Sequence, residues 1–164
     1  MKKIPLTKGM VALVDDESYE ILCGRKWILQ DSGNGILYAS SGVWIPARKT
    51  TTKLLMHREI MGNPKGMCVD HINGNGLDNQ AHNLRLCSKS QNSMNRNANE
   101  YKAGTPFKGV WPAPKGRWRS SIRAGGKATF IGIFSTPHEA ALAYNEYANL
   151  IHGKFARLNE IPDP

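Results

Sequence analysis

The stretch Asp70-His71-Ile72-Asn73-Gly74-Asn75-Gly76 follows the apolar residues Met67-Cys68-Val69. It places a carboxylate beside an imidazole where a buried strand is expected to end, and its Asn and Gly residues favour a tight turn. Successive side chains of a strand point to opposite faces. Asp70 and His71 can therefore serve one site only if the strand ends or bends at this point.

Two further amides follow at short distances, Asn83 twelve residues after His71 and Asn92 nine residues after Asn83. Hydrolysis of a phosphodiester bond needs a base for water and a cation for the developing charge. His71 suits the base, and Asn83 can accept a hydrogen bond from its ring. The oxygens of Asp70 and Asn92 suit one Mg²⁺ or Mn²⁺ ion. The pattern predicts metal-assisted cleavage of a nucleic acid.

The composition agrees with a polyanionic partner. The chain has 164 residues, a net charge of +9, a pI near 9.6 and 40% hydrophobic residues, which favours a folded protein. No apolar run is long enough to span a membrane, and Pro5, Lys8 and Gly9 interrupt any signal segment. We expect the cytoplasm of a bacterium or of a phage-infected cell, and no membrane partner.

The basic excess is concentrated after position 100. Residues 56–100 carry five basic and four acidic side chains, whereas residues 101–164 carry nine and four, with no acid before Glu139. We therefore expect the main electrostatic anchor for DNA in the C-terminal part of the chain.

The order of the patterns predicts an α+β chain of three parts and a linker. Residues 1–55 are predicted to form a β-rich segment of short strands, and Asp15-Asp16-Glu17 closes one of them. A short helix is expected after this segment and ends at Gly62. Ser88-Lys89-Ser90-Gln91 has the spacing of a helix start. We place a nuclease core at 56–97, a linker at 98–106 and a DNA-binding domain at 107–159.

The last part predicts a three-stranded antiparallel sheet packed on one helix. Strands are expected at 107–111, 117–123 and 128–134, with turns at 112–116 and at Gly125-Gly126. Thr136-Pro137-His138-Glu139 predicts a helix start, and Gly153 the helix end. The apolar stripe between them faces the sheet.

The middle segment resembles the HNH endonuclease family, in the homing-type and phage branch whose third motif residue is Asn. The resemblance rests on Met56–Gly62, Val69–Asn75, Asn83-Leu84-Arg85 and Gln91-Asn92. It implies a ββα-metal fold around a single divalent ion, with His71 as general base and Asn83 as its orienting partner. Asp70 and Asn92 would bind the metal. One such centre cuts one strand per encounter, so we expect a monomer that nicks double-stranded DNA, or double-strand breaks only if two molecules act, and the sequence does not decide between the two.

Residues 106–159 resemble the APETALA-type, or ethylene-response-factor, DNA-binding domain, through Gly109-Val110, Arg117-Trp118, Ile131-Gly132 and Phe155–Asn159 among others. The resemblance implies that one sheet face enters the major groove of DNA. Carried onto this chain, the positions that face DNA are Lys108, Trp111, Arg117, Arg119, Ser121, Arg123 and Phe130.

Two other functions compete with the nuclease. A regulator that binds DNA through the C-terminal sheet and keeps a relict nuclease domain would not cleave. A structural zinc module would use Cys68, Cys87, His57 and His82, although the three cysteines show no close pairing.

Overall fold

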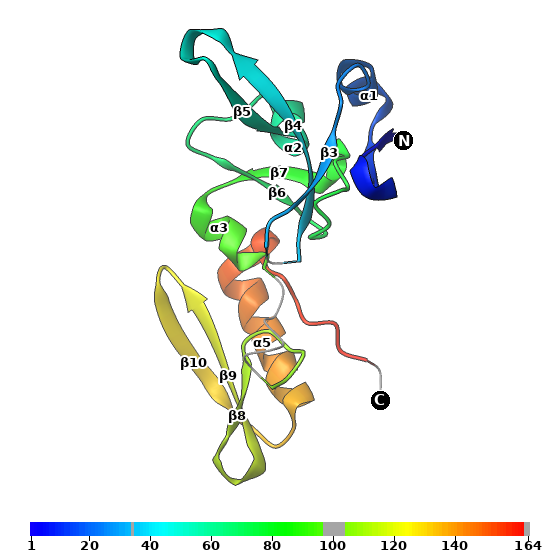
Figure 1. The fold of residues 1–164 in the computed structure, drawn as a ribbon. Coiled ribbons are helices and arrows are strands. Elements are labelled where there is room, and N and C mark those ends of the chain that lie inside the picture. Colours follow the sequence, from blue (N-terminus) through cyan, green and yellow to red (C-terminus); the bar gives the residue numbers. More distant parts are fainter. Residues whose placement is uncertain (34, 97–103, 163–164) are drawn as a thin grey trace. The chain divides into compact units, whose positions relative to one another are not determined.

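A computed structural model describes residues 1–33, 35–96 and 104–162 (Figure 1). They form two compact units, Met1–Lys89 and Ser90–Pro164. Four small antiparallel sheets and a few helices make up the two units, which confirms the predicted α+β class. No helix within the described residues has the length and apolar character needed to cross a membrane.

Within its described residues, the first unit contains seven strands and two helices. The strands are β1 (Lys2–Pro5), β2 (Val11–Val14), β3 (Ile28–Asp31), β4 (Leu37–Ile45), β5 (Thr50–Leu55), β6 (Cys68–His71) and β7 (Leu84–Cys87). The helices are α1 (Asp16–Leu22) and α2 (Met56–Ile60). β1 pairs with β2, β6 pairs with β7, and the remaining strands form a sheet in the order β3-β4-β5.

One apolar core joins the N-terminal segment to the segment around the predicted site. Ala12 and Val14 of β2 are fully buried together with Met56 of α2, and Leu77 lies in the same cluster. The predicted boundary at residue 55 remains a prediction, but the segments on its two sides bury their apolar side chains together.

Helix α1 was not expected from the sequence, because Asp15-Asp16-Glu17 reads as the end of a strand. A helix of seven residues is marginal by itself in water. The packing of buried Leu22 and of Tyr19 against the first core stabilises it, and the two acids of its first turn suit the positive end of the helix dipole.

The second unit confirms the predicted sheet on one helix. Its elements are β8 (Val110–Ala113), β9 (Arg117–Ala124), β10 (Lys127–Phe134) and α5 (Pro137–His152). The strand order is β10-β9-β8. Gly125 and Gly126 both have positive φ, as the hairpin turn requires. The Thr136 hydroxyl accepts a hydrogen bond from the Glu139 amide at 3.2 Å and caps α5 as expected.

Two local differences from the expected elements follow from the backbone. The strand predicted at 107–111 begins only at Val110, because Gly109 adopts a φ of +77° and turns the chain. The predicted turn at 112–116 shortens to Pro114–Gly116, and Pro112 lies within the edge strand β8, where a missing N–H is tolerated.

Helix α3 (Lys89–Met94) begins where Ser88 predicts. Residues 98–103 of the predicted linker lie outside the described residues.

Short 3₁₀ turns connect several of these elements. They lie at Thr7–Gly9, Pro46–Arg48, Ala81–Asn83, Pro114–Gly116 and Gly153–Phe155.

Candidate active site and nucleic-acid interface

Asp70 and His71 are the last two residues of β6, and both are buried. Asp70 lies opposite Arg85 of β7. Nε and Nη2 of Arg85 donate to Oδ2 of Asp70 at 2.8 and 2.7 Å. Both residues still belong to β6, so the alternation of the strand places their side chains on opposite faces, and their convergence on one site remains a prediction. The pair lies at the strand end, as the sequence predicts.

The His71 ring lies against two other rings. The His57 ring meets it edge-on with centroids 4.9 Å apart, and the centroid of Tyr38 on β4 lies 5.9 Å away. Nε2 of His71 lies 3.2 Å from Oδ1 of Asn79. An amide oxygen only accepts, so Nε2 carries the proton in this bond and Nδ1 carries the lone pair.

Burial sets the charge state of the two histidines. Removal from water lowers the pKa of His71, while the bond to Asn79 and the carboxylates of Asp70 and Asp78 act in the opposite direction. Burial, followed by the neighbouring His71 and Arg58, lowers the pKa of His57 to about 3. Both rings are therefore neutral near pH 7, and a neutral imidazole is the form that acts as a base.

The turn after His71 is held by hydrogen bonds of its own amide side chains. Oδ1 of Asn83 accepts from the backbone N–H of Asn73 at 2.9 Å, and Nδ2 of Asn83 donates to the carbonyl of Asp78 at 2.8 Å. Nδ2 of Asn73 donates to Oδ2 of Asp78 at 2.8 Å. Through these contacts Asn83 stabilises the turn. The side chain that contacts the His71 ring is Asn79 and not Asn83. The orienting role predicted for Asn83 remains a prediction, and it would act through the turn.

The N-terminal segment fixes the loop that carries Asn79. The Leu13 N–H donates to the carbonyl of Leu77 and the Asn79 N–H donates to the carbonyl of Leu13, both at 2.8 Å. The Asp15 carboxylate accepts from the Ala81 N–H at 2.6 Å, and this bond is the main cause of the lowered pKa of Asp15. No short-range motif marks these contacts, so neither Asn79 nor Asp15 is among the site residues expected from the sequence.

Gly76 lets the same loop approach β4. A Cβ atom at this position would lie 2.3 Å from the carbonyl oxygen of Leu37 and 2.7 Å from the Tyr38 ring. Only a residue without a side chain fits this contact. The loop, Tyr38 and His71 are therefore packed as one group.

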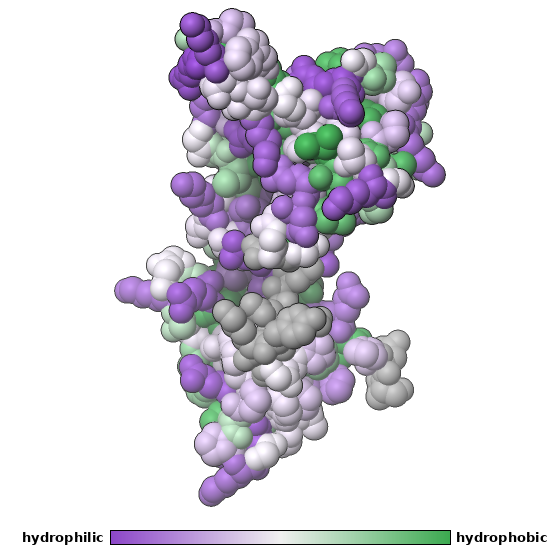
Figure 2. All heavy atoms as spheres, viewed as in Figure 1, coloured by the Kyte–Doolittle hydropathy of each residue, from purple (hydrophilic) through white to green (hydrophobic). Residues whose placement is uncertain are grey.

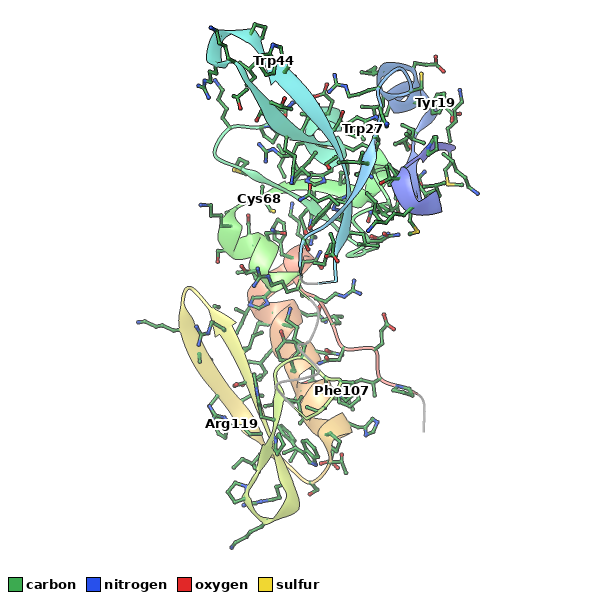
Figure 3. The ribbon with its side chains drawn as sticks, in the orientation of Figure 1. Tyr19, Trp27, Trp44, Cys68, Phe107 and Arg119 are labelled. Carbon is green, nitrogen blue, oxygen red and sulfur yellow. The ribbon has the colours of Figure 1, made fainter. Side chains whose placement is uncertain are left out.

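The second unit presents one sheet face away from α5. Trp118 packs against the core beneath α5, so the neighbouring Arg119 points to the opposite face. Arg119 lies between Trp111 and Ile133 in the register of the sheet, and its guanidinium lies 5.8 Å from the centroid of the Phe130 ring. Figure 3 shows Arg119 on the strands of this unit. The predicted DNA-facing residues that share this face are Trp111, Arg117, Arg119, Ser121, Arg123 and Phe130.

Lys108 does not belong to this face. It precedes β8, and its ammonium group donates to the carbonyl of Met94. Burial lowers its pKa to about 8. The turn at Gly109 separates Lys108 from the strand, so its predicted contact with DNA has no support from the geometry of the sheet.

The comparisons with known proteins agree with this geometry. A family model described as HNH endonuclease matches residues 59–94. An uncharacterized HNH endonuclease of Acanthamoeba polyphaga mimivirus is 30% identical over 154 residues, which cover 94% of this chain and 77% of the relative. The chain belongs to the HNH endonuclease family. Protein 3.8 of Escherichia phage T7 is 34% identical over 95 residues, or 57% of this HNH endonuclease and 77% of the phage protein.

A second group of relatives is found in plants. Dehydration-responsive element-binding protein 2C of Arabidopsis thaliana is 46% identical over 55 residues. The match covers 32% of this HNH endonuclease and only 16% of the plant protein. Both resemblances expected from the sequence are therefore confirmed at the level of similarity.

The oxygen donors of this HNH endonuclease fit a hard divalent ion. No group of three or more His, Cys, Asp or Glu side chains gathers within the described residues, so an ion here would depend on few protein ligands. Mg²⁺ is commonly bound in this way, with water and substrate phosphate as further ligands. The hydrogen bonds from Arg85 orient the buried carboxylate of Asp70, whose role as a metal ligand remains a prediction.

Asn92, the second predicted ligand, lies on α3 in the second unit. Its partnership with Asp70 around one ion therefore remains a prediction. The cysteines of the alternative zinc module face each other across β6 and β7, as Cys68 and Cys87. Burial raises the pKa of Cys87 to about 11, which keeps this thiol protonated at neutral pH.

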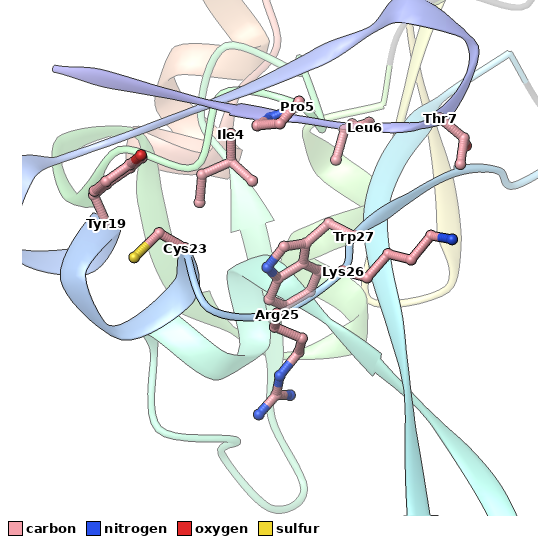
Figure 4. A pocket seen from close by; sticks show the side chains of 9 residues that line it. All are labelled: Ile4, Pro5, Leu6, Thr7, Tyr19, Cys23, Arg25, Lys26 and Trp27. Carbon is pink, nitrogen blue, oxygen red and sulfur yellow. The ribbon is translucent and has the colours of Figure 1, made fainter.

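A separate pocket of the first unit lies among the N-terminal residues (Figure 4). Its lining includes Tyr19, Cys23, Arg25 and Trp27, and no carboxylate. None of the residues predicted for catalysis or for metal binding lines it.

Proposed function

We propose that this protein is a divalent-metal-dependent endonuclease that nicks double-stranded DNA and is targeted by the sheet of its second unit. The observation that carries the proposal is the buried Asp70-His71 pair at the end of β6, with the ring of His71 held by Asn79. We place the protein in the cytoplasm of a bacterium or of a phage-infected cell, acting as a monomer on DNA.

The residues divide the reaction between them. His71 accepts a proton at Nδ1 from the water that attacks phosphorus, while Asn79 fixes the tautomer. Asn83 holds the turn in which these groups lie. Asp70 and Asn92 would hold one Mg²⁺ or Mn²⁺ ion. When bound, such an ion neutralises charge on the phosphate and stabilises the leaving oxygen.

Metal dependence gives the first test. We expect a chelator to abolish nicking of supercoiled plasmid, and Mg²⁺ or Mn²⁺ to restore it. Asp70→Asn should raise the Mn²⁺ concentration for half-maximal rate by at least about 10-fold, because an amide is a weaker ligand than a carboxylate. Asp31→Asn, at an exposed carboxylate on β3, is the control. An unchanged metal requirement in Asp70→Asn would remove Asp70 from the metal site.

The acid limb of the pH profile gives the second test. A general base acts when neutral, and burial lowers the pKa of His71 below its ordinary 6.5. The neutral form therefore persists as the pH falls through 6.5, and we expect the rate to decline only below that value. Single-turnover rates between pH 5 and pH 8 measure this limb. A midpoint above pH 6.5 would mean that the pKa of the base is higher than expected for the buried His71, and would contradict its role.

Salt dependence tests the sheet. Arg119→Ala should weaken DNA binding and reduce the slope of log K against log salt by about 1, as expected for loss of one phosphate contact. Lys154→Ala removes an exposed charge from the turn after α5, and should leave the slope nearly unchanged. Fluorescence anisotropy at several salt concentrations gives both slopes. Equal slopes for the two variants would contradict the proposed use of this face.

A further inference from the structure

The β4–β5 hairpin projects from the first unit and exposes a basic end. Figure 1 shows the two strands extending away from α2 and β3. Pro46–Arg48 connects them, and Arg48, Lys49 and Lys53 are exposed. Hydrophilic side chains gather at the outer end of the hairpin (Figure 2). No acidic residue occurs from position 32 to position 58, so the charge of this segment has one sign.

One face of the hairpin combines an aromatic ring with hydrogen-bond donors. Trp44 pairs with Thr51 and Gly42 pairs with Lys53, and directly paired residues lie on the same face. Trp44 is 57% exposed, and Figure 3 labels it near the outer end of the strands. The side chains of Arg48, Lys49 and Lys53 make no hydrogen bond or ion pair within the part of the chain that the structure describes.

The exposed Trp44 does not contribute to the first core, whose buried tryptophan is Trp27. Cations that are not paired within the protein suit phosphate oxygens, and the hydroxyl and indole groups can contact sugar and groove edges. An acidic polymer therefore complements this face in charge and in donor chemistry.

The hairpin is also connected directly to the candidate active site. Tyr38, near the start of β4, contacts the ring of His71, and β5 runs into α2, which carries His57. Trp44 lies six residues beyond Tyr38 on the same strand. At about 3.4 Å per residue the strand covers roughly 20 Å over this length. Successive phosphates of one DNA strand are also about 3.4 Å apart along the helix axis, so this length corresponds to about six base pairs.

We propose that the β4–β5 hairpin is a second DNA-binding element, which holds the phosphate backbone of the duplex about six base pairs from the scissile bond. The inference rests on the proposed nuclease function, because it takes duplex DNA as the occupant and His71 as the cutting point. The hairpin belongs to the nuclease unit itself, so it fixes the duplex at the site independently of the sheet in the second unit.

The test compares two double variants of the full chain. Lys49→Ala/Lys53→Ala removes two hairpin charges, one at a positive φ of 47° and one on a strand. Lys3→Ala/Lys8→Ala removes two exposed charges of the same first unit, again one on a strand and one at a positive φ of 62°. The backbone cost of the two double substitutions is thereby matched.

We expect the hairpin variant to lower the slope of log K against log salt by about 2, while the control keeps the slope of the native protein. A series of duplexes that carry the nick and differ in length on the hairpin side then locates the hairpin contact along the DNA. Shortening the duplex to fewer than about six base pairs on the hairpin side should erase the difference between the native protein and the hairpin variant. A photo-reactive residue in place of Trp44 should cross-link to DNA at that same distance from the nick.

Equal slopes for the two double variants would overturn the hairpin proposal, and nicking by the native protein would still support the nuclease proposal. Conversely, a reduced slope in the hairpin variant together with absence of nicking under all metals would retain the hairpin as a DNA contact and remove the nuclease function. A hairpin variant that loses affinity for anionic vesicles but keeps its DNA slope would assign this face to a membrane surface and contradict the proposal.

Discussion

Substitution of His71 by alanine should reduce the rate of plasmid nicking by about 10²–10⁴-fold, the usual cost of losing a general base. The side chain is buried and its ring contacts Asn79 and His57, so few of its atoms can reach the surface where DNA binds. DNA affinity should therefore change by less than about 2-fold. Single-turnover nicking and anisotropy on the same DNA measure the two effects separately.

His82→Ala is the matched control for this substitution. His82 lies eleven residues further along the chain and is exposed. We expect it to cleave at nearly the native rate. His71→Gln, which leaves a smaller cavity, should remain as slow as the alanine variant, and circular dichroism should show that both are folded. A parallel loss of binding, or an equally slow His82→Ala, would contradict the role of His71 as base.

Substitution of Gly109 by alanine should destabilise the second unit by about 2–5 kcal/mol. The left-handed conformation at φ +77° costs an L-residue about 1–2 kcal/mol, and overpacking adds about 1–3 kcal/mol. The new Cβ would lie 2.1 Å from the ring of buried Tyr144 and 2.8 Å from the carbonyl of Ser121. Because Ser121 belongs to the central strand, the strain falls on the sheet that we propose for DNA binding.

Gly116→Ala provides the comparison, since Gly116 also has a positive φ, of 68°, but a Cβ there meets no atom within 4 Å. It should lose only the conformational part, about 1–2 kcal/mol. Thermal unfolding monitored by limited proteolysis gives the midpoint temperature of each unit separately. In a unit of this size, each kcal/mol of lost stability should lower the midpoint by about 4–8 °C. Similar midpoints for the two variants would mean that the Tyr144 contact relaxes without cost.

The start of α5 and the hairpin turn between β9 and β10 could be predicted because their sequence signals are local. Thr136 caps the helix that begins at Pro137, and Gly125-Gly126 forms the turn that its sequence favours. The strand that was expected to begin at Phe107 begins three residues later, because Gly109 turns the chain under the Tyr144 ring. That contact joins positions far apart in the sequence, so no local pattern contains it.

The candidate site divides in the same way. Asp70 and His71 could be selected from their types and from the turn that follows them, and both lie at the end of β6. Asn79 could not, because its place beside His71 depends on the backbone bonds of its loop with Leu13. Helix α1 could not be predicted for a related reason, since its stability depends on the burial of Leu22 in the core and not on its own short sequence.

The bond between Asp15 and Ala81 has a consequence for synthesis of the protein. The two residues are 66 positions apart, so the ribosome completes the N-terminal strands long before their partner loop exists. Closing a chain segment of this length costs about 4 kcal/mol in entropy and must precede the contacts that offset it. The loop that holds Asn79 against His71 therefore forms late, and a nascent chain should remain harmless to nearby nucleic acid until most of the first unit has emerged.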